Sequence, residues 1–174
     1  MSETPDAPAP AAPAETDAAF GLRLIALLET RLEQLVQEAH VLVDDYWARH
    51  LEASSDRPAS DRGYIRVRCR LHHNTLLIEW FRQQYTRTIN PQTGRRYVFS
   101  DHFRKGRGYR YREEVFRRSA RSWELPLILE YESHFAELRR RAATLVRLRQ
   151  QIRRQLVKPP LNRGGLSSGG DADA

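Results

Sequence analysis

The sequence predicts an α+β protein: a long antiparallel helical hairpin, coiled-coil-like, carrying an inserted three-stranded antiparallel sheet and a short helix. Two stretches, residues 18–50 and 123–156, repeat apolar side chains at alternating steps of three and four, as paired helices do. Between them, residues 64–71 alternate apolar and basic residues one for one, the period of a half-buried strand. Two helices with apolar seams around one short sheet are most simply joined as a hairpin.

The first helix, expected over residues 18–50, needs a partner along its length. Its predicted seam consists of Ile25, Leu28, Leu32, Leu35, Ala39, Leu42 and Tyr46. At 1.5 Å per residue the helix is roughly 50 Å long, which is too long to be stable alone. The polar segment 54–60, with Pro58, ends it.

The first two strands are predicted to form a tight hairpin. If His73 and Asn74 make a two-residue turn, apolar residues face one another on one side of the sheet. The predicted pairs are Leu71 with Leu76, Cys69 with Ile78, Val67 with Trp80, Arg68 with Glu79, and Arg66 with Phe81. Glu79 is therefore expected to neutralise part of a face that otherwise carries a row of arginines.

A third strand and a basic loop follow. The second strand is expected over residues 75–87, a turn over 90–94, and the third strand over 95–99. Residues 104–112 form a basic loop with two glycines and two tyrosines, and a short helix begins near Tyr111.

The last helix, expected over residues 123–156 with Ser122 as its N-cap, carries the second seam. That seam consists of Ile128, Tyr131, Phe135, Leu138, Ala142, Leu145, Ile152 and Leu156. The first helix is acidic and the last is basic, through Arg139, Arg140, Arg141, Arg147 and Arg149, which favours pairing within one chain. A homodimer through the same seams is the alternative to this monomer.

We expect one domain over residues 18–157, with the basic sheet insert at 61–121 and disordered tails at 1–17 and 158–174. Cys69 is the only cysteine, so no disulfide forms, and its place on the apolar strand face predicts a structural thiol. No secretory signal and no apolar stretch of membrane-spanning length is evident, which predicts a soluble cytoplasmic protein without a membrane partner.

Charge is distributed unevenly along the chain. Residues 1–60 hold 4 basic and 11 acidic groups (net −7), residues 61–121 hold 16 and 5 (net +11), and residues 122–174 hold 9 and 6 (net +3). Lys105 and Lys158 are the only lysines. The planar guanidinium of arginine suits phosphates and base edges, although an arginine-rich chain also results from a GC-rich genome.

We find no pattern of residues that predicts catalysis, a metal or a cofactor. His72 and His73 are adjacent, so on a strand they would face opposite ways and could not chelate together. Residues 105–108 lack the spacing of a phosphate-binding loop. Tyr109 or Tyr111 beside arginines could suggest a DNA-cleaving tyrosine, but the histidine or metal groups that such enzymes need are missing. We therefore expect no catalytic residues.

Nucleic-acid binding is the function that the charge pattern favours, because basic residues are interleaved with tyrosines, Tyr111 among them, over residues 61–121. A sheet can lie in the major groove while arginines hold phosphates. The predicted DNA-binding residues are Tyr64, Arg66, Arg68, Arg70, Arg82, Arg95, Arg96, Arg104, Lys105, Arg107, Tyr109, Arg110 and Arg112. The alternatives are a coiled-coil adaptor for an acidic protein, an RNA-binding protein, or arginines that only solvate a sheet face.

Several short motifs resemble the MobI-type conjugative-transfer proteins of integrative conjugative elements and related plasmids. They are Tyr46-Trp47, Gly63-Tyr64-Ile65-Arg66-Val67, Ile78-Glu79-Trp80, Lys105-Gly106-Arg107 with Tyr109 and Tyr111, and Trp123-Glu124. The resemblance covers about residues 22–154. It implies a bacterial, non-enzymatic accessory factor that binds double-stranded DNA at the origin of transfer and helps a relaxase to initiate conjugation.

Overall fold

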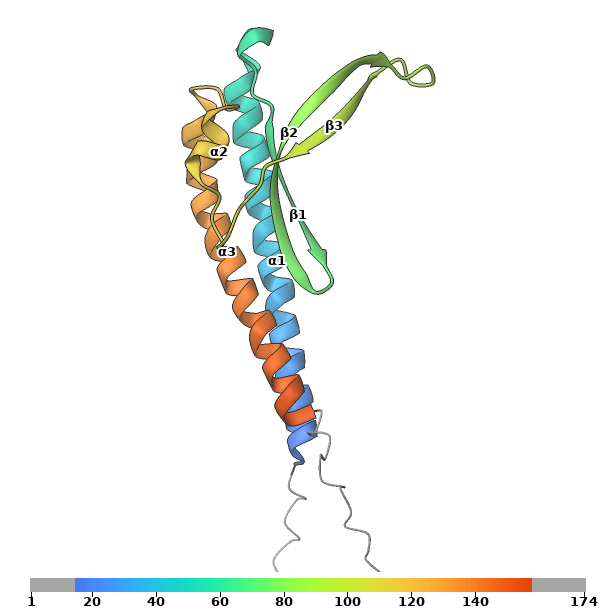
Figure 1. Ribbon diagram of the computed structural model, residues 1–174, viewed down its shortest axis with the longest axis vertical. Helices are drawn as coiled ribbons and strands as arrows, with labels where there is room; N and C mark the ends of the chain where they lie inside the picture. Colours follow the sequence, from blue (N-terminus) through green and yellow to red (C-terminus); the bar gives the residue numbers. More distant parts are fainter. Residues whose placement is uncertain (1–14, 158–174) are drawn as a thin grey trace, which may run out of the picture.

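The computed structural model describes residues 15–157, and two long antiparallel helices form its frame (Figure 1). Helix α1 runs from Asp17 to Ser55 and α3 from Glu124 to Ile152, and the π-helical turn η2 (Arg153–Val157) extends α3. Thr16 caps α1 by accepting a hydrogen bond from the amide of Ala19, so helix structure begins slightly before the predicted boundary. The remainder of the two predicted tails lies outside the described residues.

The two predicted seams pack against each other within the chain, which confirms the helical hairpin. On α1, Ile25, Leu32, Leu35, Ala39 and Tyr46 are buried, and on α3, Ile128, Tyr131, Phe135, Leu138 and Ala142 are buried. Acidic residues of α1 pair with basic residues of α3, as their opposite charges predict: Arg141 lies 3.1 Å from Glu38, and Arg149 lies 3.5 Å from Glu29. The two seams thus pair within one chain in this structure.

The sheet consists of β1 (Ile65–His72), β2 (Thr75–Ile89) and β3 (Arg96–His102), in that order and antiparallel. All five predicted pairs of the first hairpin are confirmed, from Leu71 with Leu76 to Arg66 with Phe81. His73 and Asn74 take positive φ angles of 46° and 56°, as a two-residue hairpin turn requires. A slip of one residue would have exposed the apolar face, so burial fixes this register.

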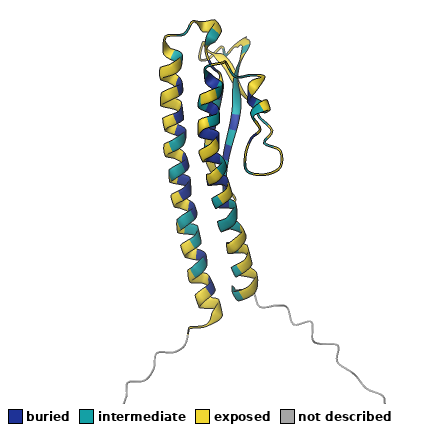
Figure 2. Ribbon diagram, turned by 90° about the vertical axis from the view of Figure 1, so that its left-hand side faces the viewer, coloured by how far each residue is buried: buried dark blue, intermediate teal, exposed yellow. Residues whose placement is uncertain are grey.

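The core lies between the inner face of the β1–β2 hairpin and the two helices, where Figure 2 shows buried residues on the facing sides. Trp80 is fully buried at its centre, with ring centroids 5.0 Å from Tyr46, 5.5 Å from Phe116 and 5.7 Å from Phe135. Phe116 comes from the short helix α2 (Glu113–Arg117). Edge-to-face aromatic contacts of this kind add to the area that the rings bury.

The two outer strands pair along different halves of β2. β1 pairs with residues 75–82 of β2, whereas β3 pairs with residues 81–89, so the strands on either side of β2 share only the few positions around Phe81 and Arg82. The β1–β2 hairpin folds back along the helices, and the outer half of β2 with β3 projects away from them (Figure 1). The third strand also ends at His102 instead of Phe99. We call residues 83–100 the ribbon.

The prediction that Ser122 caps α3 is wrong. Trp123 occupies the cap position with helical dihedral angles and makes no side-chain capping bond. The Glu124 carboxylate instead accepts a hydrogen bond from the amide of Arg121 at 3.2 Å. A carboxylate in the first turn also suits the positive end of the helix dipole.

A buried ion pair fastens the sheet and the basic loop to α3. Glu132 is fully buried and lies 2.9 Å from Arg139, which is 6 % exposed. The Glu132 carboxylate also accepts from Trp80 Nε1 at 2.6 Å and from the amide of Tyr111 at 2.8 Å. Arg139 donates to the carbonyl oxygens of Ile78 and Tyr109. Arg139 was predicted to face the acidic first helix, but it faces the sheet. The reason is that Glu132, seven residues earlier on the same helix, is its buried partner.

We predict that Glu132→Ala lowers the free energy of unfolding by about 3–5 kcal/mol, since it leaves Arg139 buried without its counter-charge. Urea unfolding followed by circular dichroism measures this. Glu137→Ala is the matched control, because Glu137 forms an exposed pair with Arg140 and should contribute less than about 1 kcal/mol. Equal losses in the two variants would contradict the assignment.

Candidate nucleic-acid interface

The outer face of the β1–β2 hairpin carries Arg68 and Arg70, and both approach the same carboxylate. Arg68 Nη2 lies 3.2 Å and Arg70 Nη2 lies 3.3 Å from Glu79 Oε2. The predicted neutralisation by Glu79 is thus confirmed, and the three side chains together leave one positive charge. Arg68 is also 3.2 Å from His102 Nε2, which connects this face to the end of β3.

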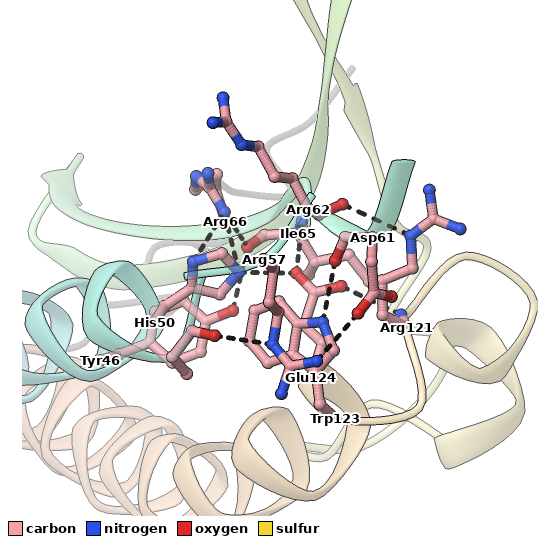
Figure 3. Close-up of polar contacts among 11 residues, drawn as sticks. Tyr46, His50, Arg57, Asp61, Arg62, Ile65, Arg66, Arg121, Trp123 and Glu124 are labelled. Carbon is pink, nitrogen blue, oxygen red and sulfur yellow. Dashed lines mark hydrogen bonds and ion pairs between the residues drawn. The ribbon is translucent and has the colours of Figure 1, made fainter. Parts of the chain in front are cut away.

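Arg66 belongs to the joint between the sheet and the helices, although it lies on the same strand face (Figure 3). Its Nη1 lies 3.0 and 3.2 Å from the two ring nitrogens of His50, and its guanidinium carbon lies 5.0 Å from the Trp47 ring centroid. Its Nε is buried without a hydrogen-bond partner in the structure. We therefore leave Arg66 out of the surface proposed below.

The joint is built on a second buried carboxylate, Glu124 at the start of α3 (Figure 3). His50 Nε2 lies 2.8 Å from Glu124 Oε1, and the side chains are 2 % and 0 % exposed. The amide of Ile65 donates to the same oxygen at 2.9 Å, and the Tyr46 hydroxyl donates to the carbonyl of Ile65 at 2.9 Å. Burial, with the Glu124 charge as the second cause, raises the pKa of the Tyr46 phenol. It therefore stays protonated and able to donate.

The pairing of His50 with Glu124 was not predicted from the sequence, although a signal for it is present. His50 follows the seam residue Tyr46 by four positions, and Glu124 precedes the seam residue Ile128 by four. Polar residues at seam positions are buried, and a buried polar group needs a partner. The sequence therefore indicates that His50 and Glu124 are partners across the helical hairpin.

The ribbon combines free positive charge with exposed aromatic side chains. Residues 80–112 contain nine basic residues and one acidic residue, Asp101, which pairs with Arg82 at 2.9 Å. Within the described chain, Arg87, Arg95 and Arg96 take part in no ion pair. The large exposed side chains of the ribbon are Tyr85, Ile89, Tyr97, Val98 and Phe99. Arg82 itself lies opposite Ile65 in the register, on the face away from Arg66, Arg68 and Arg70.

The basic loop starts at the base of the ribbon, where the Phe103 amide donates to the carbonyl of Trp80. Gly106 and Gly108 turn it, with φ angles of 74° and 91°. Lys105 Nζ donates to the carbonyl of Gly108, and burial, with the Arg139 charge second, lowers the pKa of Lys105. Its exposed arginines that enter no ion pair in residues 15–157 are Arg104, Arg107, Arg110 and Arg112.

Two tyrosines of the loop differ in their exposure. Tyr111 is 5 % exposed, so its predicted place among the surface tyrosines is wrong: the Arg139 guanidinium lies 5.0 Å from its ring and Phe116 packs beside it. Tyr109 is half-buried. The bond from the Tyr111 amide to Glu132 pulls this end of the loop into the core.

Other candidate chemistry is sparse in the described chain. Among residues 15–157, no three His, Cys, Asp or Glu side chains gather as a metal ion would need, and no described helix has the length and apolar character to cross a membrane. Cys69 is half-buried, and burial, followed by the Asp44 charge, raises the pKa of its thiol to about 11. The thiol is therefore almost fully protonated at neutral pH, in agreement with the predicted structural role.

The fold and surface define an α+β protein whose helical hairpin supports a projecting, strongly basic sheet extension. The family model described as MobI protein matches residues 35–153, and the chain belongs to this family. Membership indicates an accessory role in conjugative mobilisation. Neither the curated proteins nor the solved structures contain a match to this chain.

We predict that Gly63→Ala lowers the free energy of unfolding by about 1–3 kcal/mol, because the joint has no room for a methyl group. A Cβ at this position would lie 2.5 Å from Glu124 Oε1 and 2.7 Å from His50 Nε2. Thermal or urea unfolding provides the measurement. Ser60→Ala, at an exposed position of the same connection, should leave stability within about 0.5 kcal/mol of the parent. A Gly63→Ala protein as stable as the parent would refute the packing argument.

Proposed function

We propose that the protein is a non-enzymatic DNA-binding factor of conjugative mobilisation that acts at the origin of transfer beside a relaxase. The family assignment supports the setting, namely a cytoplasmic component of a bacterial relaxosome. The proposal of DNA binding rests on the acid-poor surface formed by the ribbon and the basic loop.

The observation that carries the proposal is the imbalance of charge over residues 80–112. One carboxylate stands among nine basic groups, and it already pairs with Arg82. Elsewhere in the described chain many arginines have carboxylate partners, for example Arg49 with Glu130 and Arg141 with Glu38. Exposed arginines without such partners attract a polyanion, and guanidinium groups bind phosphates well.

The proposed contact set is smaller than the predicted one. It keeps Arg95, Arg96, Arg104, Arg107, Arg110 and Arg112, adds Arg87, and retains Tyr109 as an aromatic contact, whereas Tyr64 is left out of the duplex contacts. Arg68, Arg70 and Arg82 are partly neutralised, Lys105 is used within the loop, and Arg66 belongs to the joint.

We predict that the triple variant Arg87→Ala/Arg95→Ala/Arg96→Ala weakens binding to an origin-of-transfer duplex by at least about tenfold. The slope of log K against log salt should become shallower by up to about 2.7, since each lost phosphate contact contributes about 0.9. Fluorescence anisotropy over a series of salt concentrations measures both quantities.

Arg147→Ala/Arg153→Ala/Arg154→Ala is the matched control, because it removes the same charge from exposed positions near the other end of the hairpin. Equal losses in both variants would show that only net charge matters. If the parent instead bound no DNA but captured an acidic protein after nuclease treatment, the adaptor hypothesis would replace this one. A shift confined to RNA would favour the RNA-binding alternative.

A further inference from the structure

The ribbon carries a shallow hollow at the place where β1 ends. Beyond the bond from the Gln83 amide to the Tyr64 carbonyl, β2 keeps only β3 as its neighbour. The hollow there measures about 550 Å³ and is lined by Tyr64, Arg82, Gln83, Gln84, Tyr85 and Arg96. Aromatic rings, amides and guanidinium groups thus lie close together at the open edge of β2.

The two tyrosines of this hollow offer ring surface that the core does not use. Their centroids are 6.4 Å apart with an angle of 71° between the rings, and the residues are 36 % and 51 % exposed. On the other strand of the ribbon, Tyr97 and Phe99 are 46 % and 49 % exposed. Residues two apart on a strand share a face, so Tyr97 and Phe99 form a second aromatic surface opposite that of Tyr85 and its partner Val98.

The positive charge of the ribbon indicates what kind of partner would bind it. The ribbon contains three arginines, Arg87, Arg95 and Arg96, and no acidic residue, and these arginines make no ion pair with any described residue. A second copy of the ribbon would bring the same arginines against each other, which is destabilising. An anionic partner with flat apolar surfaces fits both the charges and the rings.

Single-stranded nucleic acid has both of these properties. Its bases are free to stack on aromatic side chains while arginines hold its phosphates, and the stacking tolerates any sequence. In a duplex the faces of the bases are occupied by their neighbours, so the rings of the ribbon could meet only edges and backbone.

We propose that the ribbon binds unpaired nucleotides, with one base stacked in the hollow of Tyr64 and Tyr85 and the phosphates held by Arg87, Arg95 and Arg96. This rests on the proposed DNA-binding function and adds opened, single-stranded DNA to the duplex as a form that the ribbon binds. Gln83, two residues from Tyr85 and on the same face of β2, supplies an amide group that can pair with the edge of the stacked base.

The test compares the full chain with its Tyr64→Leu/Tyr85→Leu variant on an oligothymidylate and on a duplex of mixed sequence. Leucine keeps apolar bulk but removes the aromatic face, so affinity for the oligothymidylate should fall by at least about fivefold. Affinity for the duplex should change by less than about twofold. Phe20→Leu, an exposed aromatic position on α1, is the control and should alter neither affinity.

A second measurement does not depend on the variant folding well. Photo-crosslinking of the parent protein to a single strand that carries 5-iodouracil should modify Tyr64, Tyr85, Tyr97 or Phe99, as peptide mass spectrometry would show. Crosslinks confined to other segments would overturn the proposal. A concentration-dependent dimer that the double variant abolishes would overturn it too, because the rings would then belong to an interface between copies.

These experiments distinguish a failure of the single-strand proposal from a failure of the DNA-binding function. The parent protein could bind the duplex with the predicted salt dependence and yet bind the oligothymidylate no better than the double variant does. This result would refute the single-strand proposal and leave the DNA-binding function intact. A parent protein that binds neither probe would refute both.

Discussion

Two buried carboxylates on α3 determine where the sheet lies. Glu124 and Glu132 have no solvent exposure, and a buried charge is tolerated only with close partners. Each accepts a hydrogen bond from a backbone amide outside the two long helices: Glu124 from Ile65 at the start of β1, and Glu132 from Tyr111 in the basic loop. His50 and Arg139 then supply the compensating side chains. The sheet insert is thus held at two points about two helical turns apart on α3.

This constraint gives a structural role to several residues of the short sequence motifs described above. Gly63 leaves room for the Glu124 carboxylate, Trp80 donates to Glu132, and Trp123 Nε1 donates to the carbonyl of Asp61. The motifs that carry the resemblance therefore lie largely in the joint between sheet and hairpin. The surface that we propose for DNA lies outside it, on the ribbon and the outer part of the loop. Substitutions in the joint act through folding, whereas those on the ribbon act through binding.

The ribbon projects because β2 is longer than either neighbour and pairs with them along different halves. Its inner half packs on the helices and has a core, while its outer half has only β3 and no core behind it. Burial within this chain therefore does not explain the aromatic residues of the ribbon. They lie among arginines that pair with no carboxylate of residues 15–157, on an extension free of acidic residues. This combination favours an anionic partner.

The helical hairpin, the first strand pair with its register, and the place of Cys69 on the apolar strand face could all be predicted from the residues alone. These depend on local periodicity and on one two-residue turn, and a shift by one residue would have exposed the apolar face. Contacts between distant segments instead place Arg66 in the joint and bury Tyr111. Those outcomes depend on which distant groups compensate Glu124 and Glu132, and residues such as His50 and Tyr111 are separated from them by 74 and 21 positions in the chain. Spacing along the sequence carries no direct information about contacts made across such distances.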